Sequence, residues 1–231
     1  METAIGLDQA EIETRNFIVK VYSWMTAGLA VTGLIAGYMA SQPEMVINLA
    51  HSKPLFYGLL FAELGLVFVL AGWVMRMSAS MAMLAFLFYA ALNGATFSVI
   101  FLVYTSSSIA NAFFIAAGTF GVMSAYGYAT KSDLTAVGNL CFMGLIGIIL
   151  SSLANWFLKS PMLDWITTYV GIAVFVGLTA YDTQKIKQMN ILGNEGTDED
   201  AKEAISGALA LYLDFINLFL SILRATGKRR R

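Results

Sequence analysis

The chain has 231 residues, of which 58% are hydrophobic and 13% are charged, and its net charge is −1. The charged share is about half that of a typical soluble domain, so the composition indicates a membrane protein. The balanced charge argues against nucleic-acid binding. A single cysteine and a single histidine exclude a disulfide framework, a cysteine-based metal site and Ser-His catalysis.

Seven apolar runs are each long enough for a helix to cross a hydrocarbon core of about 30 Å. They cover residues 17–40, 55–75, 80–104, 109–129, 134–158, 163–182 and 205–223. The three prolines fall between the runs, and the runs lack the alternation of barrel strands. The sequence therefore predicts an all-α, polytopic membrane protein, a seven-helix bundle that forms one transmembrane domain over residues 1–231.

Three segments remain outside the predicted helices: an N-terminal tail (1–16), an acidic loop (183–204) and a basic tail (224–231). The N-terminal tail is acidic and lacks the basic start of a secretory signal, so we expect it to be retained. We expect the acidic run from Glu195 to Glu203 to be a solvated loop.

Lysine and arginine favour the cytoplasmic side of membrane proteins, and their distribution predicts a cytoplasmic N-terminus. Seven then face the cytoplasm (Arg15, Lys20, Arg76, Lys131, Lys185, Lys187 and Lys202) and two face out (Lys53 and Lys159). The five in the basic tail make the count twelve to two if the last run turns back, or seven to seven if it crosses. The charge count favours a returning tail, whereas the length of the last run, at about 1.5 Å per residue, allows it to cross. Both arrangements stay open.

The last run carries a carboxylate, Asp214, near its centre. Small and polar residues recur at helical spacing on one stripe: Gly207, Ala210, Asp214, Asn217 and Ser221. An aspartate at the centre of a spanning helix is unfavourable by about 2.5–3.5 kcal/mol, so this stripe should face other helices or water. We therefore predict that the C-terminal helix is internal.

Two further charges lie at the ends of runs that cross in the same direction. Asp182 ends the sixth run and Arg76 ends the second, so the two lie at similar depth. From position alone, each residue is explained equally well without a functional role. Arg76 can snorkel to the headgroups, and Asp182 can be hydrated at the helix end. Glu63 lies mid-way along the second run, on a different face from Arg76. It is either a hydrogen-bonded interior group or a pore-lining acid.

Four segments resemble the transmembrane Bax inhibitor motif family, in its bacterial, inner-membrane branch: GLTAYDTQKIK, ALALYLDFINLFLSILR, KVYSWMTAGL and YGYATKSDL. The resemblance covers essentially the whole chain. It implies a multi-pass protein of the cell's inner (plasma) membrane, with the last helix wrapped by the other six. It also implies a pH-sensitive calcium leak without a cofactor, in which calcium is the transported ion.

By motif match, the resemblance implies that Asp182 in YDTQ and Asp214 in YLDF are the proton sensor and line the ion pathway. It implies that Arg76 in GWVMRMSA is a basic latch. The link NEGTDEDAKE departs from the family pattern because it is longer and more acidic than in compact members.

Two nearby carboxylates in a partly dehydrated site cannot both ionise cheaply, so they would titrate as a unit. Calcium takes six to eight oxygen ligands, and two carboxylates supply at most four. Water, backbone carbonyls or Asn217 would supply the rest, and Glu63 is a further candidate for lining the pathway. Such a site binds calcium weakly and transiently, which suits permeation.

Two other classes of function compete with a leak. A non-transporting interaction protein, which regulates a membrane protease or stress survival, would need only the helical surface and a membrane-protein partner. An intramembrane aspartyl protease would use two aspartates, and Tyr181-Asp182 fits its first motif. Its second motif, GxGD, is missing because Tyr212 and Leu213 precede Asp214. We therefore expect the lipid bilayer and calcium as partners, and no enzymatic activity.

Overall fold

The computed structural model describes residues 2–230, with side chains from Gln9 to Arg230. The regular structure in this range is helical, apart from one isolated bridge between Tyr104 and Arg229. Seven of the described helices are long and apolar enough to cross a membrane. The predicted all-α, polytopic membrane architecture is thus confirmed.

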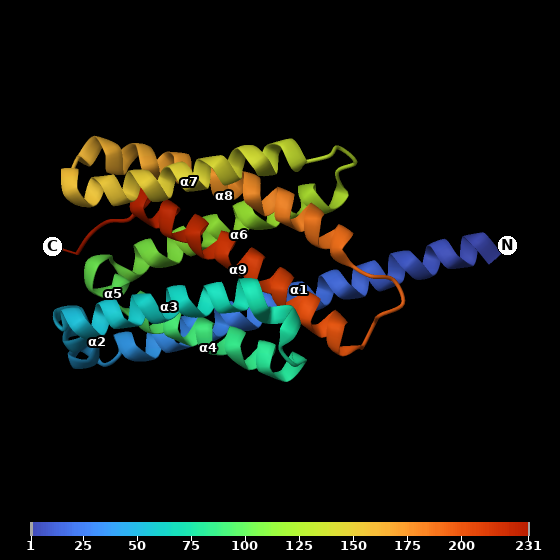
Figure 1. Ribbon diagram of the computed structural model, residues 1–231. Helices are drawn as coiled ribbons and strands as arrows, with labels where there is room; N and C mark the ends of the chain where they lie inside the picture. Colours follow the sequence, from blue (N-terminus) through green and yellow to red (C-terminus); the bar gives the residue numbers. More distant parts are fainter. Residues whose placement is uncertain (1, 231) are drawn as a thin grey trace. The chain divides into compact units, whose positions relative to one another are not determined.

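The helices follow one another with short connections (Figure 1). They are α1 (Glu2–Ala40), α2 (Pro43–His51), α3 (Lys53–Trp73), a 3-10 turn η1 (Val74–Arg76), α4 (Ala79–Ser98), α5 (Ile100–Val103), α6 (Ser106–Ala129), α7 (Thr135–Leu158), α8 (Pro161–Met189) and α9 (Asp198–Thr226).

Several helices extend past the predicted apolar runs. The tail predicted over residues 1–16 is helical from Glu2, and α8 continues to Met189. The acidic loop predicted over 183–204 is reduced to 190–197, because α9 begins at Asp198. Hydropathy finds only the part of a helix that tolerates hydrocarbon, whereas a helix ends where the backbone turns. Here Gly193 and Gly196 adopt positive φ angles of 85° and 83°, which favour glycine.

The chain divides into two compact units. One contains Met1–Val103 and Ile186–Tyr212, and the other contains Tyr104–Lys185 and Leu213–Arg231. The sequence predicted one transmembrane domain over residues 1–231. Helices α8 and α9 each continue from one unit into the other, so no linker or change in composition marks the division.

In the first unit, α1 packs along α4, which also contacts α3. The first half of α9 meets α1 and α4 through Tyr212, whose side chain is fully buried. Its hydroxyl lies 2.8 Å from Thr32 Oγ1, and its ring packs edge-to-face on Phe86 and Tyr89. Gly28 allows this approach, because a Cβ there would lie 2.7 Å from the Phe86 ring.

In the second unit, α8 packs closely on α6 and α7 where small residues meet. A Cβ at Gly127 of α6 would lie 2.2 Å from the Ala180 carbonyl oxygen of α8. A Cβ at Gly177 of α8 would lie 2.4 Å from Cys141 Sγ of α7. The first approach places backbone against backbone and the second places a small side chain against backbone; such close contacts at small residues are common between membrane helices.

The C-terminal helix is the most buried of the seven spans. In its most apolar 18-residue stretch, 67% of the residues are buried, against 39% or less in the other six. The predicted internal position of this helix is confirmed. Of its polar stripe, Gly207 and Asp214 are buried, and Ala210, Asn217 and Ser221 are half-buried.

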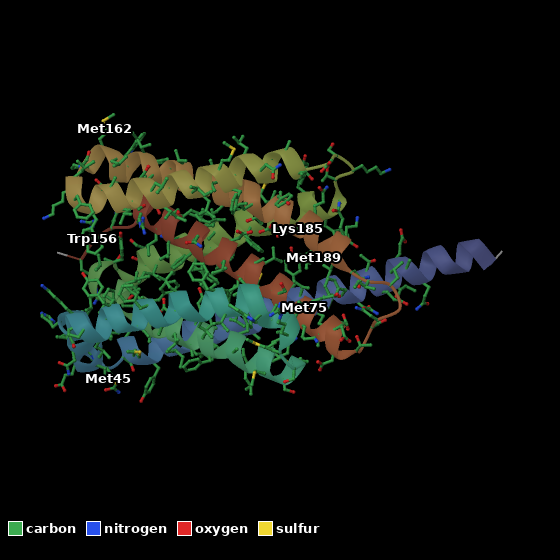
Figure 2. All side chains as sticks on the ribbon, in the orientation of Figure 1. Met45, Met75, Trp156, Met162, Lys185 and Met189 are labelled. Carbon is green, nitrogen blue, oxygen red and sulfur yellow. The ribbon has the colours of Figure 1, made fainter. Side chains whose placement is uncertain are left out.

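The last helix crosses in the direction opposite to α8. Asp214 of α9 faces Asp182 of α8. Ser221, seven positions after Asp214, faces Gly171, which lies eleven positions before Asp182. Helix α8 starts beside Trp156 and Met162, at the opposite end from Lys185 (Figure 2). Of the two arrangements that the sequence left open, this antiparallel run of α8 and α9 agrees with the crossing helix, which the length of the run allowed.

The basic tail is docked on the start of α6. The Thr105 N–H donates to the Lys228 carbonyl oxygen at 3.1 Å, and the Lys228 N–H donates to Ser108 Oγ at 3.0 Å. A short bridge between Tyr104 and Arg229 continues this contact. The tail therefore has a fixed backbone path up to Arg229.

The close contact at Gly127 generates a stability prediction. Gly127→Ala should lower the free energy of unfolding by about 1–3 kcal/mol, because the new methyl group collides with the backbone of α8. Gly118→Ala on the same helix is the matched control, since nothing lies within 4 Å of its Cβ position. Thermal unfolding of both variants in detergent checks this. Equal melting temperatures for the two variants would contradict the close packing.

Candidate functional site

The structure brings Asp182 of α8 and Asp214 of α9 together within the second unit, where their carboxyl groups are close enough to interact. Asp214 is 4% exposed and Asp182 is half-buried. The two residues that the family resemblance paired are therefore neighbours, although 32 positions separate them in the chain.

Packing on both sides of α8 fixes the position of Asp182. The ring of Tyr181, the preceding residue, lies over Gly138 of α7, where a Cβ would come within 2.5 Å of the ring. Ala180 lies against Gly127 of α6. Because successive residues of a helix point about 100° apart, these contacts leave Asp182 directed toward α9.

Hydrogen bonding in the pair depends on a proton. Asp214 Oδ2 is buried and has no hydrogen-bond partner among the described residues. An ionised carboxylate only accepts hydrogen bonds, so two carboxyl groups bond to each other only when one carries a proton. The geometry therefore suits a pair that holds one proton between its two members.

One cation acts on the pair from its own helix. Lys185 lies three positions after Asp182, so its cation is on the same side of α8 as that carboxyl group. Its ammonium group lies 5.9 Å from the centre of the Tyr181 ring. Lys185 is exposed, so solvent screens its effect.

Ser124 of α6 belongs beside the pair and was not found from the sequence. Its Oγ is buried and has no hydrogen-bond partner among the described residues. One turn before it, Phe120 packs on Phe215, the neighbour of Asp214; one turn after it, Gly127 lies against Ala180. Ser124 thus lies on the face of α6 that meets both helices of the pair.

Asn217 lies on the same stripe of α9 as Asp214, one turn later. Its amide nitrogen donates to the Leu213 carbonyl oxygen at 2.7 Å, which leaves the amide oxygen as an acceptor. Groups of three or more His, Cys, Asp or Glu that could hold a metal do not occur in the described part of the chain. With four carboxylate oxygens, the pair offers fewer ligands than a resident calcium site requires.

Arg76 and Glu63 belong to the first unit. Arg76 is exposed in η1, at the end of α3, and within its unit none of the described acidic residues forms an ion pair with it. Glu63 is half-buried and accepts a hydrogen bond from Thr96 of α4. Of the two possibilities raised for Glu63, the structure shows the hydrogen-bonded group, and a role in the pathway stays a prediction.

A carboxylate outside the spans behaves differently from the pair. Asp133 lies in the loop before α7 and is fully solvent-exposed. Hydrogen bonds from the Thr135 side chain and backbone N–H hold its pKa below the ordinary value. Asp133 therefore stays ionised at mildly acidic pH and does not serve as a sensor there.

Comparison with known proteins gives a consistent result along the whole chain. The family model described as inhibitor of apoptosis-promoting Bax1 matches residues 14–231. The inner membrane protein YbhL of Escherichia coli (strain K12) is 49% identical over 217 residues, which cover 94% of this chain and 93% of YbhL.

More distant relatives align over a similar length. An uncharacterized protein of Borreliella burgdorferi is 40% identical over 225 residues, covering 96% of this chain and 97% of its own. An uncharacterized membrane protein of Streptococcus pyogenes serotype M3 is 35% identical over 223 residues, covering 95% and 96%. These matches agree with the resemblance seen in the sequence motifs. The chain belongs to the Bax inhibitor family of membrane proteins, described as inhibitor of apoptosis-promoting Bax1.

Proposed function

We propose that this protein is a pH-sensitive calcium leak channel or transporter of the inner membrane, gated by protonation of the pair Asp182 and Asp214. The observation that carries the proposal is the contact between these two carboxyl groups, one of them almost fully buried inside a spanning helix. An ionisable residue at such depth is expensive and marks an ion or proton pathway more often than a purely structural role. The relative YbhL is named an inner membrane protein, which supports the inner membrane as the location of this chain.

In the proposed mechanism, the proton decides whether the pair attracts a cation. With one proton the pair carries a single negative charge and its carboxyl groups bond to each other. Loss of that proton leaves two facing carboxylates, whose repulsion is relieved by separation or by a divalent cation. Calcium, as the transported ion, would keep part of its water shell and take oxygen ligands from the pair, Asn217 and Ser124. Few protein ligands mean weak binding, which lets the ion leave again.

Arg76 enters the proposal as the latch. Its guanidinium group is permanently charged and has no acidic partner in its own unit among the described residues. In the resting state, we propose, Arg76 acts as the basic latch that holds the pathway closed. With the N-terminus in the cytoplasm, Arg76 and Asp182 both lie toward the cytoplasmic ends of their helices.

The proposal assigns no catalytic step to the aspartate pair. A shared proton is also what an aspartyl protease needs, but a protease needs glycines around the second aspartate to admit a substrate strand. Here Leu213 precedes Asp214, and the neighbouring Tyr212 is packed against Phe86. The interaction-protein alternative requires no ion flux at all, which the following experiment measures.

The first functional prediction concerns calcium flux into proteoliposomes that contain only this protein. Wild-type flux should change with pH, and Asp214→Asn should abolish most of that change, because the uncharged amide removes the shared proton. Asp164→Asn is the matched control, since Asp164 is an exposed aspartate on α8. If calcium flux into wild-type vesicles does not exceed the flux into empty vesicles, the leak is refuted and the interaction protein is favoured. Cleavage of added peptides would favour the protease. A pH response in Asp214→Asn equal to the wild type would remove Asp214 from the sensor.

The second prediction concerns the latch. Arg76→Ala should raise basal calcium flux at neutral pH by about fivefold or more, the lower end of typical coupling between sites. Arg15→Ala, which removes another exposed arginine from the same unit, should leave flux unchanged. Flux at or below the wild-type level in a normally inserted Arg76→Ala protein would count against the latch.

A further inference from the structure

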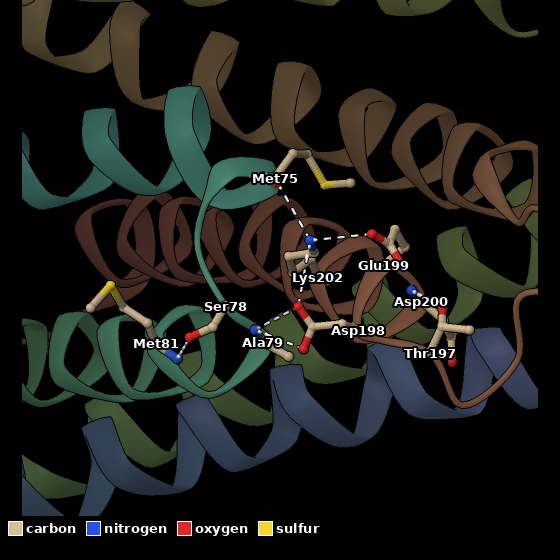
Figure 3. A network of polar contacts seen from close by, with 9 residues as sticks. All are labelled: Met75, Ser78, Ala79, Met81, Thr197, Asp198, Glu199, Asp200 and Lys202. Atoms are coloured by element: carbon tan, nitrogen blue, oxygen red, sulfur yellow. Dashed lines mark hydrogen bonds and ion pairs between the residues drawn. The ribbon is translucent and has the colours of Figure 1, made fainter.

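We infer that the first turn of α9 is a clasp that positions the turn between α3 and α4, and with it Arg76. Its two positioning residues are Asp198 and Lys202, which are four positions apart on α9 and hold the two sides of that turn (Figure 3). The effect on ion flux rests on the proposed function; the clasp itself rests on the contacts described next. All of these contacts lie within the first unit.

Lys202 holds the end of the α3–η1 segment. Its side chain is 9% exposed, and its ammonium group lies 3.5 Å from the Met75 carbonyl oxygen. Met75 directly precedes Arg76 in η1. Two carboxylates accompany the buried ammonium group, Asp198 at 3.6 Å and Glu199 at 3.7 Å. A lysine this deeply buried needs such partners, so its position is specified by the fold.

Asp198 holds the start of α4. Its two carboxylate oxygens accept a hydrogen bond from the Ala79 N–H, at 3.2 and 3.3 Å. Ala79 is the first residue of α4, and its N–H has no partner inside the helix. The Ser78 side chain caps the same helix end by accepting from the Met81 N–H. Together they satisfy two of the free donors at this helix start.

The charges are matched to the helix ends that they touch. The end of one helix exposes carbonyl oxygens and favours a cation, and the start of the next exposes N–H groups and favours an anion. Lys202 supplies the cation to the first and Asp198 the anion to the second. Because the two side chains also pair with each other, one turn of α9 ties both ends of the segment that contains Arg76.

The clasp is itself anchored on α1. Asp200, which is 2% exposed, forms an ion pair with Lys20 of α1 and accepts a hydrogen bond from the Gly196 N–H at 2.8 Å. Thr197 caps the start of α9 by accepting from the Asp200 N–H. Loss of Lys202 or Asp198 should therefore release the α3–α4 turn and leave the start of α9 in place.

This arrangement connects the latch with the sensor through one helix. Asp214 lies twelve positions after Lys202 on α9, which continues from Asp198 to Thr226. Lys202 and Asp198 thus position the latch without touching the ion pathway.

Hydrogen exchange of the full-length protein in detergent tests the clasp without reference to flux. In both Lys202→Met and Asp198→Ala, the backbone amides of residues 76–80 should exchange about tenfold faster, because a hydrogen bond to a charged group is lost. The amides of residues 198–203 should keep their protection. Methionine suits a buried position of similar length, and Lys202→Arg should restore slow exchange. Lys131→Met, which removes an exposed lysine of the loop before α7, is the control. Unchanged exchange of residues 76–80 in both clasp variants would overturn the inference.

Flux measurements on the same variants test the positioning of Arg76. Lys202→Met should raise neutral-pH flux to the level of Arg76→Ala, while the pH midpoint stays that of the wild type because the aspartate pair is untouched. Faster exchange without a rise in flux, in a protein whose flux does respond to Arg76→Ala, would overturn the link between clasp and latch. If Arg76→Ala itself has no effect, the proposed latch fails and hydrogen exchange alone decides the clasp.

Discussion

The burial of one carboxyl group inside a spanning helix is the constraint on which the rest of the structure depends. An ionisable side chain at this depth is unstable against lipid, so α9 must be surrounded by protein, and Asp214 must have a partner. Both conditions are met, since α9 is the most buried span and Asp182 lies against Asp214. The glycines that let α8 approach α6 and α7 bring Asp182 to that position.

Helix α9 serves both compact units through different chemistry along its length. Its first turn is polar and forms ion pairs with Lys20 and within the turn itself. Its first half then packs through Tyr212 in one unit, and its second half packs through Phe215 in the other.

Hydropathy was sufficient to predict the seven spans, and the polar stripe around Asp214 was sufficient to predict an internal last helix. The contact between Asp182 and Asp214 followed from motif resemblance, because spacing alone does not show which helices are neighbours. Ser124 was missed because most serines in spans bond to their own helix, and only the structure shows one without a partner. The clasp was missed because its residues were expected in a solvated loop. The four-residue spacing of Asp198 and Lys202 suggests a pair within a helix, but not their contacts with α3 and α4.

The most direct test of the account is whether Asp182 and Asp214 titrate as one unit. The carboxyl carbon resonance of Asp182 can be followed against pH by NMR in protein labelled with ¹³C-aspartate, with Asp182→Asn to assign the signal. If the pair shares a proton, Asp214→Asn should move the Asp182 midpoint by as much as about two pH units, since contacting groups commonly interact by about 0.5–3 kcal/mol. An Asp182 titration that is the same in the wild type and in Asp214→Asn would contradict the shared proton, and with it the proposed gate.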